Sequence, residues 1–253
     1  MENLEYEENI KITKFGTSHS TAIIPRKINE RTVTVIGEKA FFGRKDLREI
    51  RIPNSITHIE DYAFAKCEEV RKINIPNYVK HIGNRAFSEC FNLREIKIPD
   101  SVKFIGDYAF EWCKFSEITI PTGIKYIGDY TFFWCTELNN VIIPNSVKYI
   151  GKFAFQCCGL TEINIENVKT IEYGAFYCCR KLKSVKIPKS TKIIENYAFY
   201  ECDHLEKIEI LNPHCEICTS SIPAETVIYG YENSTAQDYA EKNGNKFIEI
   251  KNL

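Results

Sequence analysis

Cysteine is the residue type with the widest possible chemistry in this chain, because eleven cysteines occur among its 253 residues. Seven of them lie three residues after a Phe, in a recurring (Ala/Thr)-Phe-x-x-Cys unit. They are Cys67, Cys90, Cys113, Cys135, Cys158, Cys179 and Cys202. In a short secreted domain, so many cysteines would indicate a disulfide framework. A single repeated position instead predicts free thiols, stacked about 4.8 Å apart and buried as small hydrophobic groups.

Cys215 and Cys218 form the only CxxC motif, and His214 lies beside it. A zinc site needs four ligands, so this motif would need Cys202 and His204 to turn inward with it. A disulfide is a second interpretation. The third, which we favour, is packing inside a terminal cap.

The rest of the sequence offers little for catalysis. None of the five histidines lies in a nucleophile or metal motif, and GxGxxG, GxxxxGK[ST], GxSxG and HExxH are all absent. We therefore predict a protein that is not an enzyme and that uses no metal ion or cofactor.

A column of lysines recurs once per repeat, at a position that we expect to be exposed. It consists of Lys80, Lys103, Lys125, Lys148, Lys169 and Lys192. Six ammonium groups in file could bind a polyanion such as an acidic glycan. Exposed lysines on β edges also discourage aggregation, which is the structural alternative.

Aromatic residues gather just before the repeated cysteine, where early copies carry Lys66 and Glu89. The later copies carry Trp112, Phe133, Trp134, Tyr177 and Tyr200, together with Cys157 and Cys178. Contiguous exposed aromatic side chains mark partner surfaces. These five residues are our candidate protein-binding site, and local packing across the turn is the alternative. Two further aromatic columns are expected to pack on their neighbours: His58, His81, Phe104, Tyr126 and Tyr149, and Tyr62, Tyr108, Tyr130, Phe153 and Tyr197.

A sequence repeat must position all of these residues. Its copies start at Pro53, Pro76, Pro99, Pro121, Pro144, Glu166 and Pro188 and close at Leu211, in steps of 22 or 23 residues. This period, with apolar residues at fixed offsets, predicts a leucine-rich-repeat solenoid. Two of the shortened copies lack one loop residue, at 113–115 and 166–168, which should leave the ladders in register.

Within one coil, we expect a strand that ends at Ile98, before Pro99, and a second extended piece from Val102 to Ile105. Gly106 permits a bend, and Asp107 should cap a short helical turn over residues 108–113. The expected inward side chains are Val102, Ile105, Ala109, Phe110, Cys113, Ile118 and Ile120.

The chain is predicted to be one domain, 1–253, with an N-terminal cap at 1–32, repeats at 33–210 and a C-terminal cap at 211–253. Solenoid ends need divergent caps because they would otherwise expose the core. Alternation in residues 10–15 and 22–25 indicates a short β cap. In the C-terminal cap we expect a strand at 226–231, a helix at 236–242 ended by Gly244, and a strand at 246–250.

Charge and hydropathy exclude some classes of partner. The formal net charge of −1 argues against a nucleic-acid binder, which usually has a strongly basic face. No apolar run approaches the roughly 18–20 residues of a membrane span. The acidic N-terminal stretch MENLEYEENIKITKFG does not resemble a secretory signal.

The repeated IPxSVxxIGxxAFxxCxxLxxIxI and the C-terminal TVIYGYENSTAQDYA resemble the BspA-like leucine-rich-repeat proteins. The resemblance covers nearly the whole chain. It implies a solenoid used for surface adhesion or protein–protein contact, often in secreted or cell-surface proteins, and it supplies no catalytic residues. Without a secretory signal, a cytoplasmic location is also compatible with the sequence. We therefore predict a protein-binding or adhesion module, with glycan or polyanion binding and a structural spacer of a larger surface protein as alternatives.

Overall fold

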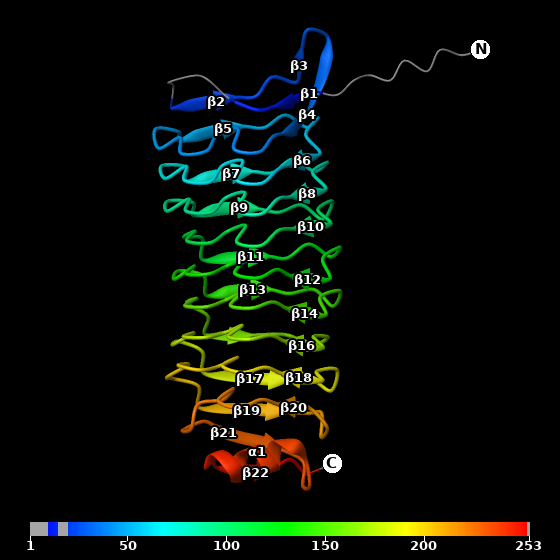
Figure 1. Ribbon diagram of the computed structural model, residues 1–253, viewed down its shortest axis with the longest axis vertical. Coiled ribbons are helices and arrows are strands. Elements are labelled where there is room, and N and C mark those ends of the chain that lie inside the picture. Colours follow the sequence, from blue (N-terminus) through cyan, green and yellow to red (C-terminus); the bar gives the residue numbers. More distant parts are fainter. Residues whose placement is uncertain (1–9, 15–19, 252–253) are drawn as a thin grey trace, which may run out of the picture.

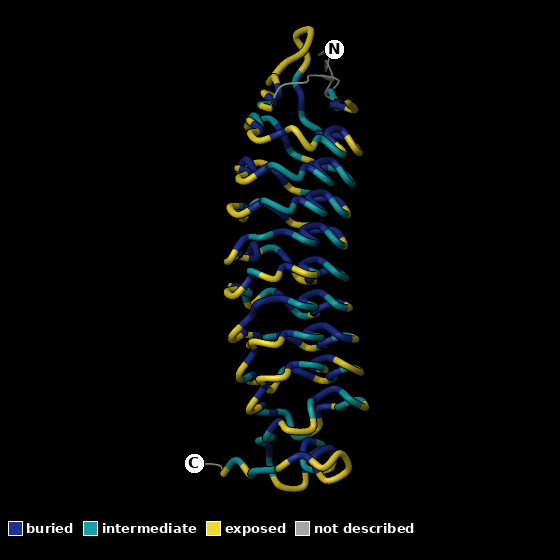
Figure 2. The backbone as a smooth tube through the Cα atoms, turned by 90° about the vertical axis from the view of Figure 1, so that its left-hand side faces the viewer, coloured by how far each residue is buried: buried dark blue, intermediate teal, exposed yellow. Residues whose placement is uncertain are grey.

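The chain folds into one file of stacked coils, as the repeat predicts (Figure 1). The computed structural model describes residues 10–14 and 20–251. Successive coils carry two short strands each and run from the N-terminal end to the C-terminal end of the stack. Figure 2 shows buried and exposed stretches alternating around each coil and recurring down the file. The leucine-rich-repeat solenoid is therefore confirmed.

The strands form two faces. The first face consists of β2 (Thr21–Ile23), β5 (Glu49–Arg51), β7 (Lys72–Asn74), β9 (Glu95–Lys97), β11 (Glu117–Thr119), β13 (Asn140–Ile142), β15 (Glu162–Ile163), β17 (Ser184–Ile187), β19 (Lys207–Ile210), β21 (Val227–Gly230) and β22 (Phe247–Glu249). The second consists of β1 (Ile10–Ile12), β4 (Arg31–Ile36), β6 (His58–Ile59), β8 (His81–Ile82), β10 (Phe104–Ile105), β12 (Tyr126–Ile127), β14 (Tyr149–Ile150), β16 (Thr170–Ile171), β18 (Ile193–Ile194) and β20 (Glu216–Ile217). A hairpin strand, β3 (Lys27–Ile28), pairs antiparallel with β4.

Equivalent strands of neighbouring coils pair in parallel, and equivalent residues face each other, as Ile73 does Ile96. The pairing is interrupted three times on the first face, between β5 and β7, β9 and β11, and β13 and β15. On the second face it is interrupted once, between β10 and β12. Strand pairing is therefore interrupted on both faces at one place only among the described residues, beside the coil that is one residue short at 113–115. The buried ladders continue past this deletion as expected, whereas the strands on its two sides do not pair.

Phenylalanine rings and thiols fill the interior at the turn that follows each second-face strand. Phe87, Phe110 and Phe132 stack with ring centroids 5.5 and 5.7 Å apart. Each repeated thiol donates a hydrogen bond to a Phe carbonyl oxygen in the preceding coil, such as Cys113 to Phe87 at 3.3 Å. All seven repeated cysteines are free and buried, and burial raises the pKa of Cys67 to about 12. The seven inward residues expected in the coil around Phe110 are also all buried.

The short helical turn expected over residues 108–113 does not form. Tyr108 and Trp112 have left-handed backbones, with φ of 57° and 61°, and the equivalent residues of the other coils do as well. The N–H groups of Tyr108, Phe110 and Trp112 bond to carbonyls of the next coil, and those of Glu111 and Cys113 bond back within the turn. This alternation leaves no run of helical hydrogen bonds.

The predicted cap residue, Asp107, also has a different role. Its Oδ1 accepts a hydrogen bond from the backbone N–H of Asp129 in the next coil, at 2.9 Å. Asp61, Asn84 and Asp129 make the same kind of contact in their coils. These side chains therefore link neighbouring coils and do not cap a helix.

The C-terminal cap matches the prediction closely. One helix, α1 (Thr235–Asn243), lies between β21 and β22 at the end of the file (Figure 1). Ser234 is its N-cap, and Gly244, with φ of 78°, ends it. At the N-terminal end, β1 pairs in parallel with β4 and β2 pairs in parallel with β5, in the same way as the strands of the later coils. Phe15, which belongs to the expected N-terminal alternation, lies outside the described residues.

Candidate partner-binding surface

The outer side of the turn carries the aromatic candidates. Two residues lie between the buried Phe and Cys of each coil. The first is buried in the early coils, as Ser88 is, and the second has the left-handed backbone and is at least partly exposed. Trp112 and Trp134 occupy that second position in neighbouring coils, and their rings stack 4.6 Å apart at 19°. Phe133 meets Trp112 edge-on at 6.4 Å. Trp134 remains 37% exposed.

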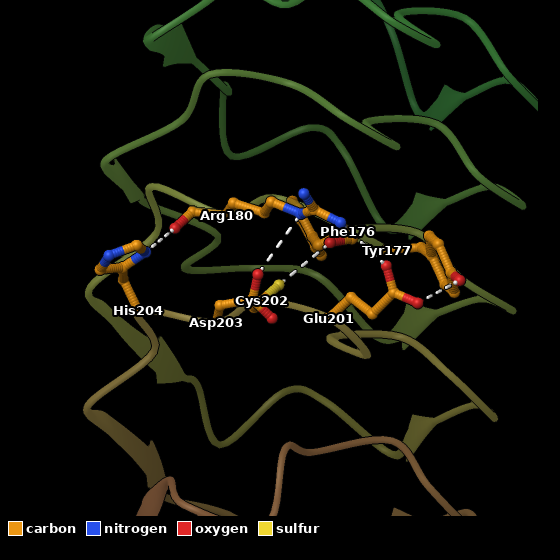
Figure 3. A network of polar contacts seen from close by, with 7 residues as sticks. All are labelled: Phe176, Tyr177, Arg180, Glu201, Cys202, Asp203 and His204. Carbon is orange, nitrogen blue, oxygen red and sulfur yellow. Dashed lines mark hydrogen bonds and ion pairs between the residues drawn. The ribbon is translucent and has the colours of Figure 1, made fainter.

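Tyr177 and Tyr200 form a second pair along the same edge, with ring centroids 5.7 Å apart. The hydroxyl of Tyr177 donates to Glu201 Oε1 at 2.9 Å, a contact visible in Figure 3. This hydrogen bond, with burial, raises the pKa of Tyr177 to about 12. Tyr200 is 40% exposed. The five predicted residues therefore lie in two clusters.

Tyr130 and Phe153, which were expected to pack on their neighbours in a separate column, join these clusters. Phe133 contacts Tyr130 at 5.5 Å, Tyr130 contacts Phe153 at 5.1 Å, and Phe153 contacts Tyr177 at 6.3 Å. We call the resulting continuous strip the aromatic edge. Its members are Phe91, Tyr108, Trp112, Tyr130, Phe133, Trp134, Phe153, Tyr173, Tyr177, Tyr197 and Tyr200, all partly exposed.

Phe91 and Tyr173 were not predicted as members of this surface. Phe91 touches Trp112 edge-on from the preceding coil, and Tyr173 bridges Phe153 and Tyr197 at 5.2 and 5.4 Å. A signal existed for Tyr173, because Gly174 replaces the usual aromatic residue there and Tyr173 stands beside it.

A charged cluster closes one end of the aromatic edge. The Arg85 guanidinium lies 3.8 Å from the Tyr108 ring and donates to Glu111 Oε2 at 2.8 Å. Ser88 also donates to that oxygen, at 3.3 Å. Burial nevertheless raises the pKa of Glu111 above its usual range, although the positive charge of Arg85 opposes the shift.

The lysine column is exposed or half-exposed along its whole length. None of its six lysines forms an ion pair with any described residue, although Lys103 and Lys148 donate to nearby carbonyl oxygens of Asp100 and Asn145. Phe104 and Tyr149, in the column next to it, are 46% and 42% exposed. The expectation that this neighbouring column packs on itself holds for His81 and Phe104, whose rings stack 4.6 Å apart.

The first face also contains a groove that the sequence analysis did not foresee. Its volume is about 730 Å³, and it lies where β9 and β11 fail to pair. Ile96 and Ile142 line it beside Asp100. In the shortened coil, Phe115 takes the place of the usual Leu and packs edge-on against Phe110 and Phe132. The Phe at this position and the missing residue were the two features of the sequence that could have indicated the groove.

The CxxC motif lies in the cap, with Cys215 buried and Cys218 half-buried, both as free thiols. Cys202 belongs to the interior ladder, and the ring of His204 bonds to the backbone oxygen of Arg180 (Figure 3). The four possible zinc ligands are therefore not assembled. Within residues 10–14 and 20–251, no three His, Cys, Asp or Glu side chains are placed to hold a metal ion.

Comparison with known proteins extends these observations. A leucine-rich-repeat protein from Bacteroides ovatus is 23% identical over 91% of this chain and 92% of its own, with a TM-score of 0.48. A leucine-rich cell-surface protein from Faecalibacterium prausnitzii is 26% identical, with a TM-score of 0.50. It matches 78% of this chain, which spans 59% of that protein. A leucine-rich-repeat protein from T. pallidum is 22% identical over 95% of this chain and 90% of its own, with a TM-score of 0.52.

No curated protein sequence matches the chain. Among the described residues, no helix is long and apolar enough to cross a membrane. Such a solenoid is consistent with a protein-interaction or surface module. The profile of the BspA-type leucine-rich-repeat region, which holds six copies, matches residues 8–111 and 103–222. Together with the stacked coils, this match shows that the chain belongs to the BspA-type leucine-rich-repeat family.

Proposed function

We propose that the protein is a non-catalytic binding module that adheres to a partner protein through the aromatic edge, centred on Trp112, Phe133 and Trp134. The observation that carries the proposal is the continuity of the edge. Its rings touch from coil to coil over six successive coils, which corresponds to about 24 Å at about 4.8 Å per coil.

The rings of the aromatic edge are held in place before a partner binds. Stacking between Trp112 and Trp134 fixes both side chains before a partner arrives, so little rotamer entropy is lost on binding. Trp and Tyr are also the residues most often found to dominate binding energy at interfaces. The interior does not need them, because the buried Phe and Cys ladders already fill the turn.

The test replaces Trp112 and Trp134 with Ser and measures capture of proteins from cell or host extract. Tyr78→Ser is the matched control, because Tyr78 is 61% exposed and lies outside the aromatic edge. We expect the double variant to lose the captured protein and the control to keep it. Equal capture by both variants would contradict the assignment of the edge.

The lysine column supports a second candidate function, the binding of an acidic glycan, because none of its six ammonium groups forms a salt bridge with a described residue. Heparin is a suitable probe. Binding should weaken steeply between low and physiological salt, and Lys125→Gln with Lys148→Gln and Lys169→Gln should weaken it further. The control changes three exposed lysines elsewhere, Lys181, Lys183 and Lys189. Equal losses in both sets would rule out a site at the column.

We also propose that this function is exercised at the cell surface. The support is the similarity to the F. prausnitzii protein, which is described as a cell-surface protein. Mass spectrometry of the N-terminus of the protein from its source cell would test this location, together with labelling of intact cells by an impermeant reagent. Labelling only after cell lysis would contradict it.

A further inference from the structure

Two cysteines outside the interior ladder lie on the turn edge. Cys157 and Cys178 occupy the same outward position in neighbouring coils, the position that Trp112 and Trp134 occupy earlier in the file. Both are half-buried, unlike the ladder thiols beside them. The backbone N–H of Cys157 bonds to the carbonyl of Tyr177 at 2.9 Å, which keeps the two coils in register at this point.

The spacing suits a covalent bond between the two sulfurs. Equivalent residues of stacked coils lie about 4.8 Å apart, and disulfides join residues whose Cα atoms are about 4.4–6.8 Å apart. Cys157 and Cys178 stand at equivalent positions of neighbouring coils, as such a bond requires. We propose that Cys157 and Cys178 form a thiol–disulfide exchange site, which reacts with a low-molecular-weight disulfide and closes into a disulfide between the two coils.

The surroundings assign a different role to each thiol. Burial, followed by the contact with Cys178, raises the pKa of Cys157 to about 12, so this thiol stays protonated at neutral pH. Attraction to Cys178 is the largest cause that raises the pKa of Arg180 above its usual range. The Arg180 Nε and Nη2 atoms lie 3.3 and 3.4 Å from Asp203 and Glu201 (Figure 3). Cys178 is therefore the attacking thiol and Cys157 the resolving one.

The two steps balance. Cys178, as the thiolate, attacks one sulfur of the external disulfide RSSR, so that a Cys178–SR bond forms and RS⁻ leaves and takes up the proton that Cys178 released. Cys157 then loses its proton to water, and the resulting thiolate attacks the Cys178 sulfur and expels the second RS⁻, which takes up a proton in turn. The two protein thiols are oxidised, and RSSR is reduced to two RSH.

The experiment incubates the reduced, folded protein with glutathione disulfide and follows it by mass spectrometry. Cleavage after Lys169 and Arg180 separates the two cysteines onto different peptides. We expect the wild type to yield these peptides joined by a disulfide, and Cys157→Ser to stop with one glutathione on the peptide that contains Cys178. Cys178→Ser should show no link and at least tenfold slower modification.

Cys218→Ser serves as the matched control, because Cys218 is another half-buried thiol, and it should behave as the wild type. Cys178→Glu provides a second variant that the fold tolerates at this position, since Glu89 and Glu201 occupy it in other coils with the same backbone. A wild type whose peptides remain unlinked would overturn the proposal. A link that survives in both Cys178 variants would also overturn it, because the ladder thiols would then be the source.

Discussion

The inner and outer sides of the turn edge differ sharply although the same short segment builds both. Phe132 and Cys135 point inward and belong to ladders that recur in nearly every coil. Phe133 and Trp134, between them in sequence, point outward, and the position of Trp134 holds Lys, Glu, Trp, Cys or Gly in different coils. The stack fixes what lies inside, whereas the outside is free to carry function.

The largest effect should come from the inner side. Phe132→Ala removes a fully buried ring that stacks on Phe110 and Phe155, so we expect the free energy of unfolding to fall by about 3–5 kcal/mol. Phe133→Ala, one residue away, should cost only about 1 kcal/mol, the value of an aromatic contact. Chemical denaturation of both variants measures the difference. Equal losses would mean that the two sides are not distinct.

Gly43→Ala should have an intermediate effect, lowering the free energy of unfolding by about 1 kcal/mol through the backbone conformation alone. Gly43 has φ of 71° at the left-handed position, and a Cβ there would meet nothing within 4 Å. The expected loss is therefore the cost of the left-handed conformation for a residue with a Cβ. Ala65→Gly, at the neighbouring position in the next coil, is a useful comparison by thermal denaturation. A fully neutral Gly43→Ala would contradict the conformational explanation.

The smallest effect concerns pH at the end of the aromatic edge. Burial raises the pKa of Glu111 in the folded protein, so the folded state holds this proton more tightly than the unfolded state does. The stability contributed by this group is present below the ordinary carboxyl pKa and is lost as pH rises through the raised value. Glu111→Gln should therefore be at least as stable as the wild type at pH 7 and should lose that advantage at pH 4. Melting temperatures at both values, with Glu89→Gln as control, test this.

The periodicity predicted the parts of the fold that repeat. The strands, the buried ladders and the cap with α1 follow from apolar spacing and from signals such as Gly244. The prediction of a helical turn was wrong because residue types such as Tyr108 and Trp112 do not indicate a left-handed backbone. Gly43 and Gly174, at these same two positions in their coils, were the only hints.

The candidate surface was predicted in part. Periodicity identified Trp112, Trp134 and Tyr200 as outward residues, because their position tolerates polar side chains elsewhere. It could not show that Tyr130 and Phe153 join them, because ring contacts depend on how side chains cross between columns. The groove beside β9 and β11 could not be predicted for a similar reason, because strand pairing depends on two neighbouring coils together.

Thiol labelling in the folded state tests most directly the claim that position in the repeat separates the inside from the outside. After reduction, an alkylating reagent should modify Cys178 and Cys218 in the native protein. The seven ladder cysteines and Cys215 should react only when denaturant unfolds the stack. Labelling of Cys113 or Cys135 in native protein at the rate of Cys218 would contradict the account.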